Sequence, residues 1–307
     1  MSIRTDVTLP SFLFVGTAKA GTTSIEKYLK QHPDICIPRK ETFYFLKDIY
    51  RNNHLSYPLQ RRRDEYILNK EVYEEEYAGI EAMVTGEVGT GYLFHHELAI
   101  PRIKETLGDD VKILMVLRHP VDRCYSSYLH FAKDLHEKGT FEEVLDSEEK
   151  RFKEGWDFMW QHRLMGLYAK QVEAYLGAFK EVKVLFYEDF RRAPDVFMKE
   201  VFEFIDVNPN INLDLAKTHN ASGTPKNETL QRFITQETFL KRLVRPLFRL
   251  VFSKDRREKI RKEAKGRNLK KSEGLSAEQR SKLMSFYSDD IAELSALIGR
   301  PLTEIWN

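Results

Sequence analysis

The chain has 307 residues, 42% of them hydrophobic, and a formal net charge of +2 at pH 7. Such a chain can bury a sizeable core and fold as one large α/β domain or two small ones. Two cysteines, Cys36 and Cys124, exclude a disulfide framework and a cysteine metal cluster, and no run approaches the roughly 18 apolar residues of a membrane span. We therefore expect a cytoplasmic protein.

The first predicted element is a buried strand that ends in a glycine-rich turn. Phe12 to Val15 form a short apolar run, Gly16 ends it, and helical spacing resumes at Ile25. The turn between them, GTAKAGTT, carries a lysine and several hydroxyls and leads into a helix whose first amides point into the same hollow. An anion of phosphate shape is the expected ligand. The residues expected to bind it are Lys19, Ala20, Gly21, Thr22, Thr23 and Ser24.

The spacing of this turn is close to the Walker A sequence, G-x-x-x-x-G-K-[ST], but Thr22 stands where that motif has its lysine. The turn instead resembles the 5′-phosphosulfate loop of the sulfotransferases that use 3′-phosphoadenosine-5′-phosphosulfate (PAPS). Their pattern, T-x-K-x-G-T-T, is met in full from Thr17 to Thr23. The alternative is a tight strand-to-helix turn that serves packing alone.

After the first helix, a short predicted strand from Ile35 to Pro38 leads into a lysine, a glutamate and an aromatic cluster, which suit the wall of a pocket. Residues Lys40 to Phe45 resemble the K-E-x-x-F-F region of the heparan sulfate branch of the family, which carries its catalytic glutamate there. The resemblance implies that Glu41 is the general base, so that Lys19 and Glu41 are the catalytic pair. A surface ion pair of Glu41 with Lys40 or Arg39 is the structural alternative.

A second predicted core strand, Met83 to Val88, brings three rivals for the role of base. The cytosolic branch of the family places a histidine after the corresponding strand, which makes Glu87, His95 and His96 alternatives. The two histidines are adjacent, so they cannot share one helical face, and no H-E-x-x-H motif or cysteine partner accompanies them. We therefore expect no metal site.

The third predicted strand, Val111 to Leu117, is nearly continuous apolar sequence, as in a central parallel strand covered on both faces. Arg118 follows at its carboxyl end, and Ser126 lies in the next helix. Ligands of open parallel sheets collect at that edge, so both side chains can reach one anion. The stretch LRHPVDRCYSS also resembles the family's 3′-phosphate segment residue for residue. In the structural alternative, Arg118 pairs with a carboxylate and Ser126 only solvates a helix.

The later elements continue the alternation of helices and strands, which predicts a parallel sheet. A fourth strand is expected at Val182 to Phe186, and the residues after it, Tyr187 to Phe190, resemble the family's Y-E-D-L, which we interpret as packing and helix capping. Helices are expected at 141–152, 164–179 and 195–205 and within 276–306.

A polar loop around Gly223 is the candidate for a late nucleotide contact. In the resembling family a loop near this point closes over the nucleotide and adds donors to the 3′-phosphate, which implies Ser222 and Lys226 as further ligands. The family's K-G-x-x-G form is absent, and the stretch from Lys265 to Arg267 is a rival for the same role.

Two polar regions, 46–82 and 227–271, are expected to be helical or loop insertions near the acceptor side. Between Lys241 and Lys271, fourteen Lys or Arg stand against three Asp or Glu. Residues 239–252 form a basic amphipathic segment interrupted at Pro246. Such a segment could contact a membrane surface or a partner, although stripes of this kind more often lie on their own core.

The sequence thus predicts one P-loop-like α/β domain over residues 1–307, with a central, mostly parallel sheet of about four or five strands flanked by helices on both faces. The resemblance implies in-line transfer of a sulfuryl group from PAPS to a hydroxyl or amine, with release of 3′-phosphoadenosine-5′-phosphate (PAP). The acceptor would be a small molecule, a glycan or a lipid, and neither a metal nor a nucleic acid is expected. The alternatives are a P-loop kinase or NTPase, which would need a lysine at position 22, and a basic membrane-surface or nucleic-acid-binding module.

Overall fold

A computed structural model gives the fold of residues 7–51, 66–215, 224–227, 229–231, 256, 263–264, 267–270 and 272–306, which are the residues described below. Their central feature is an all-parallel sheet in the order β2-β3-β1-β4-β5. The strands are β1 (Phe12–Gly16), β2 (Ile35–Cys36), β3 (Val84–Val88), β4 (Lys112–Leu117) and β5 (Val182–Phe186). The predicted parallel α/β fold is confirmed, and β1 rather than β4 occupies the middle position.

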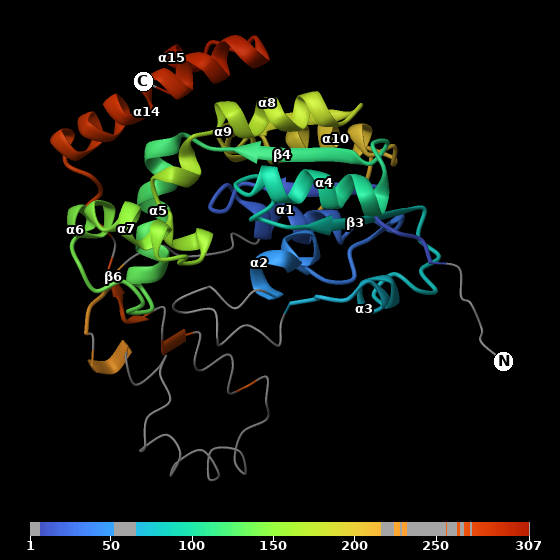
Figure 1. Ribbon diagram of the computed structural model, residues 1–307, viewed down its shortest axis with the longest axis horizontal. Coiled ribbons are helices and arrows are strands. Elements are labelled where there is room, and N and C mark those ends of the chain that lie inside the picture. Colours follow the sequence, from blue (N-terminus) through green and yellow to red (C-terminus); the bar gives the residue numbers. More distant parts are fainter. Residues whose placement is uncertain are drawn as a thin grey trace.

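Alternate residues of the strands build two separate cores, one on each face of the sheet. Phe12 and Phe14 pack with α1 (Thr22–Leu29), α9 (Tyr187–Arg192) and α10 (Pro194–Phe204). Leu13 and Val15 point to the other face, which is covered by α4 (His96–Leu107), α8 (Ala169–Ala178) and α14 (Ala277–Ile298). Figure 1 shows α14 running beside α8 on the outside of this second layer. Helices therefore cover both faces, as the sequence predicts.

The remaining elements are short, except for the 13-residue helix that follows β4. They are η1 (Tyr44–Leu46), α2 (Lys47–Arg51), α3 (Lys70–Glu75), α5 (Pro120–Ala132), α6 (Phe141–Asp146), α7 (Glu148–Lys153), η4 (Phe158–Trp160), η5 (Leu164–Gly166), α15 (Leu302–Ile305) and the antiparallel pair β6 (Thr224–Pro225) and β7 (Leu269–Lys270). Among the helices of the described ranges, none has both the length and the apolar character that crossing a bilayer requires.

Two helices predicted as continuous are interrupted, and contacts distant in sequence explain one of the breaks. The stretch 164–179 begins as the 3-10 turn η5, and α8 starts only at Ala169. There the carboxylate of Asp290, on α14, accepts the backbone amides of Tyr168 and Ala169 at 2.7 and 3.0 Å and so caps the helix. The stretch 141–152 is split between α6 and α7 at Ser147.

The contact between β1 and β3 requires a glycine at position 86. In the register that pairs Phe12 with Gly86, a Cβ atom added to Gly86 would lie 2.1 Å from the Phe12 ring. We expect Gly86→Ala to lower the free energy of unfolding by about 1–3 kcal/mol, because the ring has no space to move in the core. Urea unfolding followed by circular dichroism measures this change.

Gly177→Ala is the matched control, since an added Cβ at this position in α8 meets nothing within 4 Å. Alanine favours helices by up to about 1 kcal/mol over glycine, so this variant should be as stable as the parent or more so. Equal stability of Gly86→Ala and the parent would contradict the β1–β3 register.

Candidate active site

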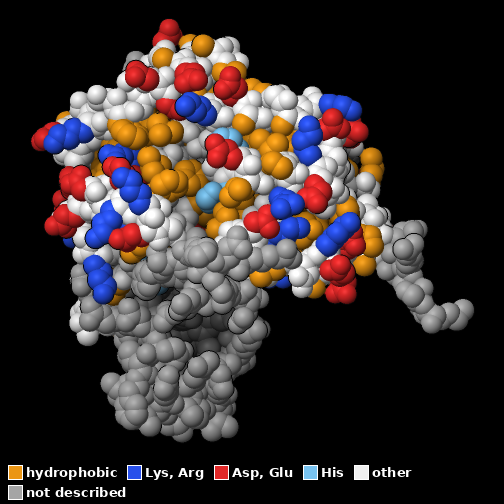
Figure 2. Space-filling view, viewed as in Figure 1, with side chains coloured by type: hydrophobic (Ala, Val, Ile, Leu, Met, Phe, Trp, Pro, Cys, Tyr) orange, Lys and Arg blue, Asp and Glu red, His pale blue; other side chains and the backbone are white. Residues whose placement is uncertain are grey.

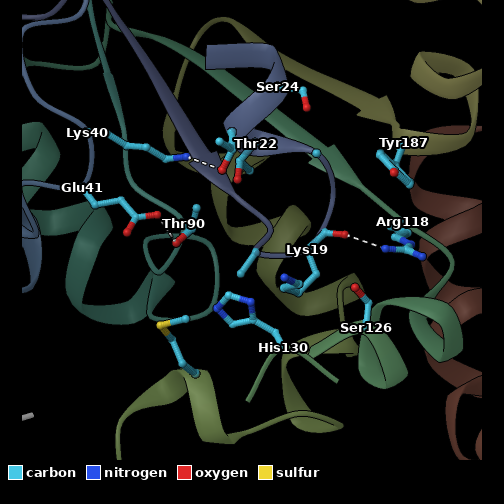
Figure 3. Close-up of a pocket in the computed structure, with 14 residues that line it drawn as sticks. Lys19, Thr22, Ser24, Lys40, Glu41, Thr90, Arg118, Ser126, His130 and Tyr187 are labelled. Atoms are coloured by element: carbon cyan, nitrogen blue, oxygen red, sulfur yellow. Dashed lines mark hydrogen bonds between the residues drawn. The ribbon is translucent and has the colours of Figure 1, made fainter. Parts of the chain in front are cut away.

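A cavity of about 430 Å³ opens where the carboxyl ends of β1, β3 and β4 meet (Figure 3), within the size range of small-molecule sites. Its walls come from the turns after these strands, the segment after β2, helix α5 and the start of α9. The lining residues are Ala18, Lys19, Gly21, Thr22, Thr23, Ser24, Lys40, Glu41, Thr90, Arg118, Ser126, His130, Met159 and Tyr187. The structure thus brings the predicted phosphate turn, Glu41, Arg118 and Ser126 into one hollow.

The turn after β1 is held by its own backbone and by its neighbours. Thr17 donates its amide to the carbonyl of Val116 at 2.9 Å, and Ala20 donates its amide to the carbonyl of Thr17 at 3.3 Å. Gly21 has φ 82°, and a Cβ there would meet the Tyr187 ring at 2.9 Å, so both backbone and packing require glycine. Helix α1 begins directly after it, and its first amides therefore face the cavity. Ala20 is fully buried beneath the turn and does not line the cavity.

Lys19 is a partly buried cation with several other cations near it. Burial is the main cause that lowers the pKa of its ammonium group to about 8, and the charges of Lys133, Arg118, Arg123 and Lys40 lower it further. Both effects disfavour the charged form of Lys19 while no anion is bound. The negative charge of a bound phosphate would offset them, so the site favours binding of an anion.

Arg118 ties the end of β4 to the phosphate turn. Its guanidinium donates to the carbonyl of Lys19 at 2.9 Å and lies over the Tyr187 ring, 4.8 Å from the centroid. In the described part of the chain its partners are therefore a carbonyl and a ring, rather than the carboxylate of the structural alternative. Its own carbonyl accepts the Tyr168 hydroxyl at 3.0 Å, which fixes the strand end. Ser126 lines the same cavity from α5.

The neighbours Lys40 and Glu41 point to different walls of the cavity (Figure 3). Lys40 donates to the Thr23 hydroxyl at 3.0 Å and pairs with Glu26 at 3.2 Å, which attaches it to α1. Glu41 accepts a hydrogen bond from the Thr90 hydroxyl at 3.0 Å. Lys40 is thus engaged elsewhere, and so is Arg39, which pairs with Glu76 at 3.2 Å on another side of the segment. The surface ion pair considered as an alternative for Glu41 is not the arrangement observed.

The three rivals for the base lie away from this cavity. Glu87 is fully buried among hydroxyl groups, and burial raises the pKa of its carboxyl. His95 and His96 line a separate hollow of about 660 Å³ between α4, α8 and α14. Figure 2 shows histidine and apolar side chains gathered on that face. Burial, and then the charge of His96, lowers the pKa of His95 to about 4, so its imidazole is neutral at physiological pH.

Outside the predicted turn, four residues that line the cavity were not predicted: Thr90, His130, Met159 and Tyr187. One of them had a signal, because His130 follows Ser126 by four residues in the same predicted helix and so shares its face. The predicted packing role of the segment that begins at Tyr187 is correct in part. The Tyr187 ring packs against Gly21, and the neighbouring Glu188 accepts the His119 amide at 2.9 Å. Within the described ranges, no cluster of His, Cys, Asp or Glu is arranged to hold a metal ion.

The late loop is described only in part. Lys226 is exposed beside the β6–β7 pair, where its ammonium donates to the carbonyl of Arg267 at 3.0 Å. It does not line the cavity. Ser222, Lys265 and Gly266 lie outside the described residues, as does the amphipathic segment 239–252. The assignment of a late loop to the 3′-phosphate therefore stays a prediction.

Comparison with known proteins places these features in a family. Residues 9–294 match the family model described as "Sulfotransferase domain". A solved structure, a sulfotransferase from Alicyclobacillus acidocaldarius, is 28% identical with a TM-score of 0.74 and covers 98% of this chain and 99% of its own. The human bifunctional heparan sulfate N-deacetylase/N-sulfotransferase 3 is 28% identical over 310 residues.

The curated relatives are longer proteins. The alignment with the human bifunctional enzyme takes in 96% of this chain but 31% of that protein. A mouse heparan sulfate glucosamine 3-O-sulfotransferase 3A1 is 25% identical over 187 residues, which is 61% of this chain and 42% of the relative. The chain therefore spans less than half the length of these relatives.

Anion binding at Lys19 should take up a proton at alkaline pH. The free lysine has a pKa of about 8, and the negative charge of a bound phosphate would raise it back toward its ordinary range. At about pH 9 most of one proton should therefore be taken up per bound anion, and affinity should fall as the pH rises through 8. Calorimetric titration with PAP in two buffers of different ionisation enthalpy measures the uptake. The variant Lys19→Gln should abolish it, and undiminished uptake in that variant would assign the proton to another group.

Proposed function

Because the chain belongs to the sulfotransferase domain family, whose members are enzymes that transfer sulfate groups, we propose that it moves a sulfuryl group from PAPS to a hydroxyl or amine and releases PAP. One observation carries the proposal of this donor. A single cavity gathers three cationic side chains, Lys19 in the turn before α1, Lys40 and Arg118, together with the hydroxyl of Ser126. A nucleotide with a phosphate at both its 5′ and 3′ positions matches that arrangement.

The turn after β1 is proposed to bind the 5′-phosphosulfate. Lys19, the hydroxyls of Thr22, Thr23 and Ser24, and the amides from Gly21 to Thr23 would surround it, with the positive end of the α1 dipole behind them. These groups stabilise the negative charge that the leaving phosphate oxygen gains as its bond to sulfur breaks. Removal of one such preorganised donor costs on the order of 10²-fold to 10³-fold in rate.

Arg118 and Ser126 are proposed to bind the 3′-phosphate and so to distinguish PAPS from nucleotides without it. The stacking of Arg118 on Tyr187 holds its guanidinium plane in place before any ligand arrives. Ser222 and Lys226, or the rival stretch 265–267, remain proposed additions to the same site. These cations and amides can neutralise the charge of both phosphates, so the proposed mechanism does not call on a metal ion.

Glu41 is proposed to be the general base. Figure 3 shows Glu41 and Thr90 on one side of the cavity and Arg118 on the other. Glu41 accepts the acceptor's proton as the new S–O or S–N bond forms, and Lys19 stabilises the group that leaves on the far side of the sulfur, so the two residues hold the reactants in line. His130 enters from α5 and is a further polar side chain in the cavity.

The acceptor is proposed to be a glycan or another molecule with a hydroxyl or amine group, since the names of the relatives include heparan sulfate and glucosamine.

We propose that 1–307 form one domain and that 46–82 and 227–271 approach the acceptor. In support, η1 and α2 follow directly after Glu41. Both cysteines are free thiols, which supports a cytoplasmic location. A lipid acceptor and membrane contact through 239–252 rest on the sequence alone.

Arg118 should determine the preference for a 3′-phosphate. A charge-assisted contact contributes about 1.5–3 kcal/mol, so PAP should bind at least about tenfold tighter than AMP to the parent protein. Arg118→Ala should remove most of that ratio, while the exposed Arg192→Ala, on α9, should keep it. The ratio is the correct readout because Arg118 also holds the turn at Lys19, so its loss should weaken both nucleotides.

Calorimetry or thermal shift with PAP, AMP, Mg-ATP and DNA measures these affinities. PAP at 100 times its Kd should stabilise the protein by about 2.7 kcal/mol. An unchanged PAP-to-AMP ratio in Arg118→Ala would mean that the second phosphate is bound elsewhere, and stabilisation by Mg-ATP in place of PAP would favour the kinase or NTPase alternative.

Glu41→Gln should lower turnover by about 10²-fold or more and leave PAP affinity intact, because it removes a proton acceptor and no phosphate ligand. The measurement is transfer of radiolabelled sulfate from PAPS to the best substrate in a panel of phenols, amino sugars and unsulfated glycans. Glu76→Gln, which changes the partner of Arg39 outside the cavity, is the control and should keep full turnover. Full activity in Glu41→Gln would place the base elsewhere.

A further inference from the structure

Glu87 is a carboxylate enclosed in the protein core. It lies on β3, has 0% of its surface exposed, and accepts hydrogen bonds from three hydroxyl groups. The Tyr73 hydroxyl donates to one oxygen at 2.7 Å, and the hydroxyls of Thr42 and Tyr92 donate to the other. All three donors are buried as well. They come from three segments that are distant in sequence, so a single carboxylate connects these segments.

Such a group is costly for stability. A buried carboxylate loses its hydration, and neutral hydroxyls compensate less than a cation would. An apolar side chain at position 87 would avoid this cost, since Glu87 lies beside a core cluster of aliphatic and aromatic side chains that includes Phe45 and Leu93. The presence of Glu87 therefore needs a reason other than stability, and the segments that it connects supply one.

The first of these segments carries the proposed base in a strained backbone. Glu41 and Phe43 both have left-handed φ values, 57° and 55°, which cost non-glycine residues about 1–2 kcal/mol each. Thr42 lies between them. Its hydroxyl donates to Glu87 and also accepts the amide of Tyr44 at 3.2 Å. Glu87 therefore holds the middle of the strained segment.

The second segment carries the hydrogen-bond partner of the base. Thr90, which donates to Glu41, lies in the turn after β3, and Tyr92 lies two residues further on. The Tyr92 hydroxyl donates to the same Glu87 oxygen that accepts from Thr42. One buried oxygen thus links the residue next to Glu41 to the turn that contains Thr90, in addition to the backbone bond from the Glu41 amide to the Val88 carbonyl.

We propose that Glu87 is a positioning residue, whose buried carboxylate fixes Glu41 and Thr90 relative to each other without contacting substrate. The inference rests on the proposed role of Glu41 as base. It replaces the alternative in which Glu87 itself exchanges protons with the acceptor, because no part of Glu87 reaches the cavity.

The test is a double-mutant cycle between Glu87→Gln and Glu41→Gln. Glu87→Gln keeps the shape of the side chain but weakens the hydrogen bonds that it accepts from three hydroxyl groups, so Glu41 should lose its alignment. We expect kcat to fall by about 10- to 100-fold, with PAP affinity unchanged within about twofold. In the Glu41→Gln background the same change should alter the residual rate by less than about threefold, because the residue through which Glu87 acts is already absent.

A second pair of variants separates positioning from general damage to the core. Tyr73→Phe removes one donor to Glu87 and should lower kcat by a smaller factor in the same pattern. Tyr287→Phe removes a buried hydroxyl that donates to the Arg163 carbonyl at 2.8 Å, remote from this network, and should leave kcat unchanged. If Glu87→Gln fails to fold, Tyr73→Phe measured in both backgrounds decides in its place.

Two outcomes overturn different statements. If Glu41→Gln retains full turnover, the proposed base is wrong and the basis of the inference is lost. If Glu41→Gln is inactive but Glu87→Gln keeps full kcat, or slows turnover equally in both backgrounds, then Glu87 does not act through Glu41 and the inference itself is wrong.

Discussion

The gathering of like charges around one hollow is the constraint on which this structure depends. Lys19 is partly buried near Arg118, Lys40 and Lys133, and the charge of each of these three residues makes the charged form of Lys19 less stable. The fold has to hold them there in the absence of any anion. It does so by attaching each to a neighbour, Arg118 to the Lys19 carbonyl and Lys40 to Glu26. An anion that enters such a site meets donors that are already oriented, which is the main source of electrostatic catalysis.

The rest of the chain supports these attachments from a distance. Asp290 on α14 caps α8 at Tyr168, and the Tyr168 hydroxyl in turn donates to the carbonyl of Arg118. A helix near the end of the chain is thereby connected to the cation at the end of β4. The central position of β1 has the same effect on the other side, since β1 pairs with both β3 and β4 and brings their carboxyl ends to one edge.

The parts of the site that follow directly from a strand could be predicted, and the parts assembled by tertiary contacts could not. Lys19 and Arg118 follow apolar runs that are typical of buried parallel strands, so their meeting at one edge follows from the predicted topology. Tyr187 also follows such a strand, but an aromatic residue there predicts packing equally well. Glu87 shows the same limit, because alternation gives the face of β3 on which it lies but not the hydroxyls that surround it. The start of α8 was missed since its cap, Asp290, is distant in sequence.

The sheet also explains how the two halves of the site are held in register. The phosphate turn follows β1, whereas Glu41 and Thr90 belong to the segments after β2 and β3. Backbone pairing places Leu13 of β1 opposite Glu87 of β3, and the amide of Glu41 donates to the carbonyl of Val88 at 2.8 Å. The nucleotide half and the acceptor half therefore share one rigid frame. This backbone frame places the segment that carries Glu41 beside the phosphate turn, and the hydrogen bond from Lys40 to Thr23 then fastens the two halves to each other.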